Sequence, residues 1–240
     1  MSDAREPILN IPAALTALIG VICAIHGLRA LLSPMDDQLL VWAFGFLPAR
    51  YDATLFASSP FPGGAGAKVW TFFTYSLLHA DLNHLGFNML WLLPFGSALA
   101  RRFGAWRFFL FLIVASACGA VVHLATHSHE QIPMIGASAA ISGAMAACMR
   151  FAFARGSFLG LGRGEGVDAA YVPASSLVAA LQNSRVLTFV IIWFVVNIVF
   201  GIGALSMGGE TQAIAWQAHI GGFLAGLLLF SYFDPVPPQS

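Results

Sequence analysis

Long apolar stretches separated by polar connections dominate this chain of 240 residues. A helix that crosses a lipid bilayer needs about 20 mostly apolar residues, and six stretches come close to that length. They are Ile11–Leu32, Leu82–Leu99, Trp106–Ala125, Met134–Phe153, Val186–Leu205 and Ala213–Tyr232. The pattern predicts an all-α, polytopic membrane protein in which residues 11–232 form one six-helix membrane domain. Residues 1–10 and 233–240 are then short tails.

Two connections are longer than adjacent helices require. The connection from Ser33 to Val69 carries several aromatic side chains, which favour the boundary between membrane and water. We therefore expect it to lie on or partly within one membrane interface. The connection from Gly156 to Arg185 is rich in glycine and serine. Its Pro173–Gln182 stretch is compatible with a short surface helix, because proline suits the first turn.

Composition supports the membrane assignment. Apolar residues make up 58% of the chain and charged residues only 9%, whereas a soluble domain carries roughly 25% charged residues. The formal net charge is zero, so no basic surface indicates nucleic acid as a partner. The three cysteines lie in apolar stretches without C-x-x-C spacing, which indicates neither a disulfide framework nor a zinc knot. We expect no metal and no cofactor, and we expect the lipid bilayer to surround the domain.

Basic residues are distributed unevenly between the two sides of the predicted bundle. Cytoplasmic loops are enriched in arginine and lysine, so the side with more of them is predicted to face inward. With the N-terminus inside, the residues at inner positions are Arg5, Arg101, Arg102, Arg107, Arg150, Arg155, Arg163 and Arg185. Arg29, Arg50 and Lys68 fall outside. The bias predicts that both termini are cytoplasmic.

Three short segments bring polar residues into the predicted spans, where such side chains are costly and often functional. They are centred on His84 and Asn88, on Ser138, and on His219. Taken singly, each segment has a plainer explanation in helix packing or in a lone core histidine. Gly222 and Gly226, for example, form a small-xxx-small pair of the kind that lets two helix backbones approach closely.

The direction of the helices distinguishes between these explanations. The second, fourth and sixth spans all run from outside to inside, and each carries its polar segment within its first several residues. All three segments should therefore lie at one depth in the outer half of the membrane. Helix packing alone gives no reason for that. A catalytic site does, because a serine nucleophile needs a base and histidine is the usual one.

Ser138 and His219 are thus the candidate nucleophile and general base. His84, Asn88 and the amide of Ser138, at a helix N-terminus, are candidate donors to a developing oxyanion. A buried acid to orient His219 is not evident, since Glu210 lies nine residues earlier, roughly 13 Å along a helix. We therefore predict a Ser–His dyad rather than a triad.

The three segments, in this order and on these spans, resemble the rhomboid family of intramembrane serine proteases. The resemblance covers roughly residues 69–232. The family's G-x-S motif matches residues 136–138, and its A-H-x-x-G motif matches residues 218–222. Its second-helix H-x-x-x-x-H-x-x-x-N pattern matches residues 79–88. Each motif is short, and it is their joint spacing that makes the resemblance specific.

The resemblance implies a role for each matching residue. Ser138 would be the nucleophile and His219 the general base, while His84 and Asn88 would help to form the oxyanion hole. Supporting positions are His79, which is expected to support the outer loop, Gly136 and Gly222.

The sequence departs from the family pattern at four positions without losing a reacting group. Glycine usually follows the nucleophile, whereas Ala139 follows it here and adds a methyl group near the expected oxyanion region. The W-R pair of the first loop is Trp70–Thr71, and Ala100 stands where a glutamate is common. Ser142 stands where some members have a tyrosine that stacks on the catalytic histidine.

The expected function is an endopeptidase that cuts transmembrane protein substrates in the outer half of a bacterial inner membrane. The alternative is a non-catalytic rhomboid-like protein that binds or escorts membrane clients. Relatives of that kind typically lack the serine or the histidine, and both are present here. A transporter would predict an internal repeat or broken helices, and neither is evident. A metalloprotease is disfavoured because no H-E-x-x-H occurs, and His127, His129 and Glu130 indicate a solvated loop rather than a metal site.

Overall fold

The fold is known from a computed structural model that describes residues 11–58, 61–153, 169–201 and 215–237. Helices are the regular elements of this part of the chain, which confirms the predicted all-α class. The α-helices are α1 (Ala13–Arg29), α2 (Pro34–Phe44), α3 (Ala53–Ser58), α4 (Ala67–Thr74), α5 (Leu82–Thr126), α6 (Ser138–Cys148), α7 (Leu177–Gln182), α8 (Ser184–Gly201) and α9 (Trp216–Phe233). Short 3-10 helices are η1 (Pro48–Tyr51), η2 (Tyr75–Leu77) and η3 (Ala169–Tyr171).

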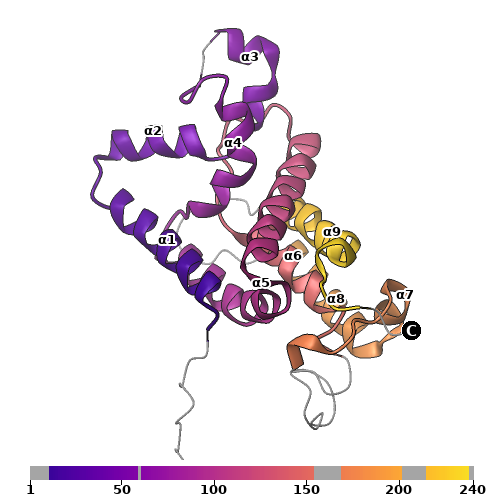
Figure 1. The fold of residues 1–240 in the computed structure, drawn as a ribbon. Helices are drawn as coiled ribbons and strands as arrows, with labels where there is room; N and C mark the ends of the chain where they lie inside the picture. The colour runs from indigo at the N-terminus through magenta and orange to yellow at the C-terminus, as the bar shows by residue number, and fades with distance from the viewer. Residues whose placement is uncertain (1–10, 59–60, 154–168, 202–214, 238–240) are drawn as a thin grey trace, which may run out of the picture.

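Helices α5, α6 and α9 pack against one another at the centre of the molecule, and they carry the three polar segments of the sequence. Helices α1, α2 and α4 lie on one side of this centre, and α7 and α8 lie on the other (Figure 1). Buried apolar side chains, among them Leu92, Phe111 and Ala144, form one continuous cluster between the helices. Helix α6 is buried from Ala139 to its last residue, so the centre of the bundle surrounds it.

Helix α5 contains two of the predicted spans. Gly104 interrupts its helical backbone with a φ of 71° and divides it into two arms that run in different directions (Figure 1). The arms correspond to the predicted spans Leu82–Leu99 and Trp106–Ala125. Within the described residues, α5 is the one helix long and apolar enough to cross a membrane by length and hydropathy. Helices α1 and α6 are apolar but shorter, at 17 and 11 residues, so the count of six spans stays a prediction.

The fourth predicted span, Met134–Phe153, is too long at both ends, because α6 covers only Ser138–Cys148. Its N-terminal residues are extended instead: Met134 and Phe46 exchange backbone hydrogen bonds of 2.8 and 2.9 Å. Gly136 then adopts a φ of 117°, which a helix does not allow. The helix therefore begins at Ser138 itself. The fifth and sixth predicted spans correspond to α8 and α9, and their residues 202–205 and 213–214 lie outside the described part.

The connection from Ser33 to Val69 is largely helical rather than an irregular loop. Ser33 caps α2 by accepting a hydrogen bond of 3.2 Å from the backbone of Asp36, and Pro34 occupies the first turn. Both are sequence signals for a helix start. Two of its aromatic side chains pack together beside α4: Phe46 contacts Tyr51, at 5.6 Å between ring centroids, and also contacts Phe72 of α4, at 5.0 Å. The second long connection contains α7, which lies within the stretch predicted as a surface helix.

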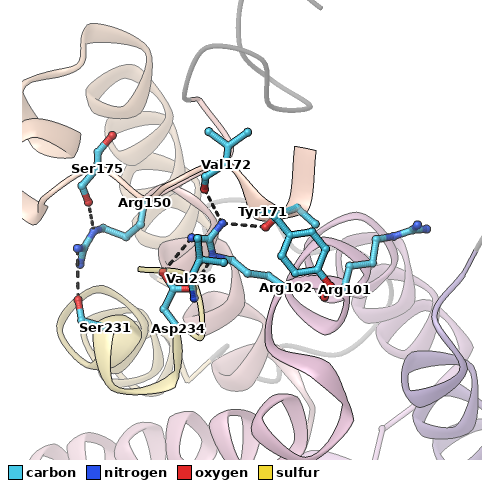
Figure 2. Close-up of polar contacts among 10 residues, drawn as sticks. Arg101, Arg102, Arg150, Tyr171, Val172, Ser175, Ser231, Asp234 and Val236 are labelled. Carbon is cyan, nitrogen blue, oxygen red and sulfur yellow. Dashed lines mark hydrogen bonds and ion pairs between the residues drawn. The ribbon is translucent and has the colours of Figure 1, made fainter. Parts of the chain in front are cut away.

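Arg102 joins the kinked helix α5 to the end of α9. Its side chain is fully buried and forms two parallel bonds with Asp234, at 2.8 and 2.9 Å (Figure 2). Its remaining terminal nitrogen donates to the carbonyl oxygens of Ala170 and Val172, each at 2.8 Å. The guanidinium also lies 4.5 Å from the centre of the Phe151 ring. The guanidinium of Arg102 therefore connects three separate segments of the chain, which contain Asp234, Ala170 with Val172, and Phe151.

Replacing Arg102 with leucine is expected to lower the free energy of unfolding by about 3–5 kcal/mol, because the buried Asp234 carboxylate loses its partner. Unfolding in mixed micelles, followed by circular dichroism, measures this change. Replacing both Arg102 and Asp234 with leucine should recover part of the loss, since no charge then stays buried. An equal loss in the single and the double variant would contradict this account of the pair.

Candidate active site

Ser138 and His219 meet at the centre of the bundle. The serine Oγ lies 2.7 Å from Nε2 of the histidine, although the two residues are 81 positions apart. Helix α6 begins at Ser138, and His219 lies in the first turn of α9. Both side chains are only partly buried, so an entering molecule can reach them. The structure therefore brings together the pair of residues that the sequence singles out.

Glycines produce this approach by letting α9 contact the backbone of α6. A Cβ atom at Gly222 would overlap the carbonyl oxygen of Ala139, and one at Gly226 would overlap that of Gly143. Gly143 is equally restricted, because a Cβ there would lie 2.9 Å from the carbonyl oxygen of Gly222. The small-residue pair predicted in the sixth span thus faces α6, and His219 lies one turn before it.

Asn197 on α8 contacts the other side of the His219 ring. Its Oδ1 atom lies 2.5 Å from Nδ1 of His219, and its Nδ2 group donates to the backbone carbonyl of Trp193 at 2.7 Å. The second bond fixes which end of the amide faces the histidine, because only Nδ2 can donate. The ring nitrogen that faces Oδ1 must then carry the proton. This tautomer leaves a lone pair on Nε2, which accepts the hydroxyl proton of Ser138.

Asn197 is not among the site residues predicted from the sequence, because the group expected to orient His219 is an acid. A signal was present, since Asn197 is an amide in the middle of an otherwise apolar span and is 8% exposed. The sequence therefore predicts a dyad. In the structure a neutral amide takes the place that an acid holds in a Ser–His–Asp triad.

His84 borders the same site from the first turn of α5. A Cβ atom at Gly136 would lie 2.6 Å from Nε2 of His84 and 3.8 Å from Oγ of Ser138, so both atoms surround this glycine. Nδ1 of His84 accepts a hydrogen bond of 3.4 Å from the backbone of Ala80. Its Nε2 therefore carries the proton, and this N–H group borders Gly136, two residues before Ser138. Asp81 caps α5 by accepting from the His84 backbone at 2.8 Å, which holds the residue in place.

Asn88 and His79 both contact His84. Asn88 is buried one turn further along α5, and its Nδ2 group donates to the backbone carbonyl of His84 at 2.8 Å, not to Ser138 or His219. The buried ring of His79 packs edge-on against that of His84, at 5.1 Å between centroids. Burial, reinforced by the nearby His84 ring, lowers the pKa of His79 to about 3, so His79 is neutral at physiological pH. Arg29 holds the His79 backbone by donating to its carbonyl at 2.7 Å.

The structure shows how two departures from the family pattern, Ala139 and Ser142, are accommodated. The methyl group of Ala139 points to α5, where Gly119 leaves room for it, because a Cβ at Gly119 would lie 2.7 Å from that methyl. Ala139 therefore packs in the cluster with Phe46 and Tyr75. Ser142 turns back along its own helix and donates from Oγ to the carbonyl of Ser138 at 2.8 Å.

Comparisons with known proteins show the family to which the chain belongs. A family model described as the rhomboid domain matches residues 66–234, which include every residue of the site. The rhomboid protease GluP of Bacillus subtilis (strain 168) is 27% identical over 162 residues, which cover 68% of this chain and 25% of the relative. The rhomboid protease GlpG of Enterobacter sp. (strain 638) is 25% identical over 170 residues, which cover 71% of this chain and 50% of the relative. The aligned part of the chain thus spans between a quarter and a half of the length of these relatives.

Proposed function

Because the chain belongs to the rhomboid family, whose members are integral membrane proteins, we propose that it is an intramembrane serine endopeptidase. The observation that carries this proposal is the 2.7 Å bond between Oγ of Ser138 and Nε2 of His219. A protein that only escorts membrane clients has no need of this bond. The experiment that tests the proposal is cleavage of a transmembrane substrate by the purified chain and by its Ser138→Ala variant.

In the proposed reaction, Oγ of Ser138 attacks the carbonyl carbon of the scissile peptide bond while Nε2 of His219 accepts the hydroxyl proton. The tetrahedral intermediate collapses when the imidazolium returns that proton to the leaving amine. The acyl group remains on Ser138 as an ester. Water then attacks the ester, again with His219 as base, and protonation of Oγ restores the serine and releases the new carboxyl terminus.

Asn197 is proposed as a positioning residue that acts through His219. Its Oδ1 atom accepts the Nδ1 proton throughout, so the ring keeps its Nε2 lone pair toward Ser138. A carboxylate would do the same with greater stabilisation of the imidazolium, but a buried charge is costly inside a membrane. A neutral amide avoids that cost, which gives a physical reason for asparagine on an apolar helix.

Replacing Asn197 with alanine is expected to lower kcat by about 10- to 100-fold with little change in KM, as loss of an orienting partner does at other histidines. The Asn197→Asp variant keeps an oxygen acceptor toward Nδ1 and should retain more activity than the alanine variant. Steady-state kinetics on a transmembrane substrate measures both. If the alanine variant has the same kcat as the unmodified chain, Asn197 has no part in the reaction.

His84 is proposed as the side-chain donor of the oxyanion hole, because its Nε2 atom and the hydroxyl of Ser138 both border Gly136 and its Nε2 carries a proton. The amide of Ser138, at the start of α6, is the proposed backbone donor. Asn88 is proposed to assist, and its bond to the His84 carbonyl supports an effect through that residue. Gly136 keeps the space between the two groups open.

We further propose that residues 11–232 form one multi-pass membrane domain with both termini in the cytoplasm of a bacterial cell. Ser138, His219 and His84 all lie in the first turns of their helices, which supports a single depth for the site. Transmembrane proteins cleaved in the outer half of the bilayer are the proposed substrates. Labelling of introduced cysteines from either side of the membrane tests this orientation.

A further inference from the structure

A second group of ionisable side chains lies at the end of α5, apart from the serine site. His123, His127 and Glu130 each offer one possible metal-ligand atom, and these atoms lie within 4.8 Å of one another. The two histidines are one helical turn apart, and their rings stack at 4.9 Å with an angle of 16°. His123 lies in the last turn of α5, and His127 is the residue at which the helix ends, with its N–H group donating to the carbonyl of His123 at 2.9 Å.

Buried polar atoms in this group lack hydrogen bonds. His123 is 4% exposed, and among the described residues its Nδ1 atom has no hydrogen-bond partner. Its Nε2 atom lies 3.2 Å from Oε2 of Glu130, which is also buried and has no hydrogen bond in the described part of the chain. An unsatisfied buried polar atom costs about 1–3 kcal/mol, and a cation bound between Oε2 of Glu130 and Nε2 of His123 would satisfy the carboxylate oxygen.

The backbone holds Glu130 in position for such a ligand. Its N–H group donates to the carbonyl of His127 at 3.0 Å, and its carbonyl accepts from Ala49 at 2.9 Å. His127 and Glu130 are partly exposed, which gives an ion a path from solvent. The neighbouring His129 does not join the group, because its Nδ1 atom pairs with Asp52 at 2.7 Å. The candidate metal ligands are therefore His123, His127 and Glu130, and His129 is not one of them.

We propose that His123, His127 and Glu130 bind one zinc ion. Two imidazoles and a carboxylate form a ligand set that zinc favours, and three protein ligands leave a fourth position for water. The ion would replace the direct contact between His123 and Glu130, and small rotations of the half-buried His127 and Glu130 would close the coordination sphere. The site would act as a clip that ties the loop after α5 to the end of that helix. This loop leads through Met134 to Ser138, so the clip supports the strand-like segment before α6.

The experiment titrates zinc into the full chain, purified in detergent without an affinity tag and treated with a chelator, and follows binding by calorimetry. One zinc ion per chain is expected. Glu130→Gln and His127→Ala should each weaken binding by at least about 10-fold, since even loss of a residue that only supports a ligand has such an effect. The matched control His129→Ala should bind zinc as the unmodified chain does. Zinc should also raise the thermal midpoint of the unmodified chain and of the control, but not that of the two ligand variants.

These two ligand variants replace partly exposed side chains, so circular dichroism should show the helical content of the unmodified chain. Absence of one-to-one binding in the unmodified chain would overturn the proposal. Binding of equal strength in both ligand variants would also overturn it. In either case His123 and Glu130 make only their direct contact. Because the measurement needs no cleavage, its result is independent of the proposed protease function.

Discussion

Replacing Ser138 with alanine is expected to abolish cleavage of a transmembrane substrate, with a loss in kcat of at least about 10³-fold. Oγ of Ser138 is the protein atom that forms the covalent bond to the carbonyl carbon of the substrate, so a methyl group cannot replace the hydroxyl. His219→Ala should have a loss of similar size, because Ser138 and His219 act as a unit and their effects are not additive. Cleavage assays with purified protein in lipid vesicles measure both.

Ser142→Ala is the matched control for this loss. Ser142 lies one turn further along α6, and its hydroxyl is already engaged by the backbone carbonyl of Ser138. Its replacement should leave most of the activity.

The kcat of His84→Ala should lie between those of Ser138→Ala and Ser142→Ala. It should be lower than that of the unmodified chain by about 10²- to 10³-fold, as expected for loss of one oxyanion donor. Full activity in Ser138→Ala, or complete loss in Ser142→Ala alone, would reverse the assignment of the nucleophile.

Replacing Gly222 with valine is expected to lower the free energy of unfolding by about 3 kcal/mol or more and to abolish cleavage. A Cβ atom at this position overlaps the carbonyl of Ala139, and backbone cannot move aside as a flexible side chain can. Helix α9 would have to separate from α6, which would also move His219 away from Ser138. Unfolding in mixed micelles and cleavage kinetics report the two effects.

Gly20→Val provides the control for this substitution. Gly20 is exposed on α1, and a Cβ atom there meets no other atom within 4 Å. Its replacement should change the free energy of unfolding by no more than about 0.5 kcal/mol. Similar stability losses in the two variants would show that valine disturbs the helices themselves rather than their close contact.

Much of the fold and of the candidate site follows from local patterns. Apolar stretches of helical length predict the helices, and the predicted common direction of three of them predicts one level for Ser138, His219 and His84. These features need only local sequence and the bilayer as a frame. The position of each helix end is less predictable, since it depends on partners far away. Met134 leaves the helical conformation because Phe46 offers it a backbone partner, and the sequence around Met134 does not encode that contact.

Asn197 and Arg102 illustrate the remaining limit. The value of Asn197 lies in a contact with His219, 22 residues away on another helix, and only the packing of α8 against α9 decides which residue it meets. The charge bias places Arg102 on the inner side, but it does not predict that the side chain is buried against Asp234, 132 residues later. Hydropathy predicts the helical regions in which both residues lie. It does not predict the neighbours on other helices that decide what each side chain contacts.

Covalent labelling of the nucleophile tests the central claim most directly. The full chain in detergent is treated with a fluorophosphonate, which reacts with activated serines, and the modified peptide is identified by mass spectrometry while cleavage activity is followed in parallel. The account predicts a single adduct on Ser138 that forms as activity disappears, that also forms in Ser142→Ala, and that does not form in His219→Ala. An adduct on another serine, or full activity after complete modification of Ser138, would contradict it.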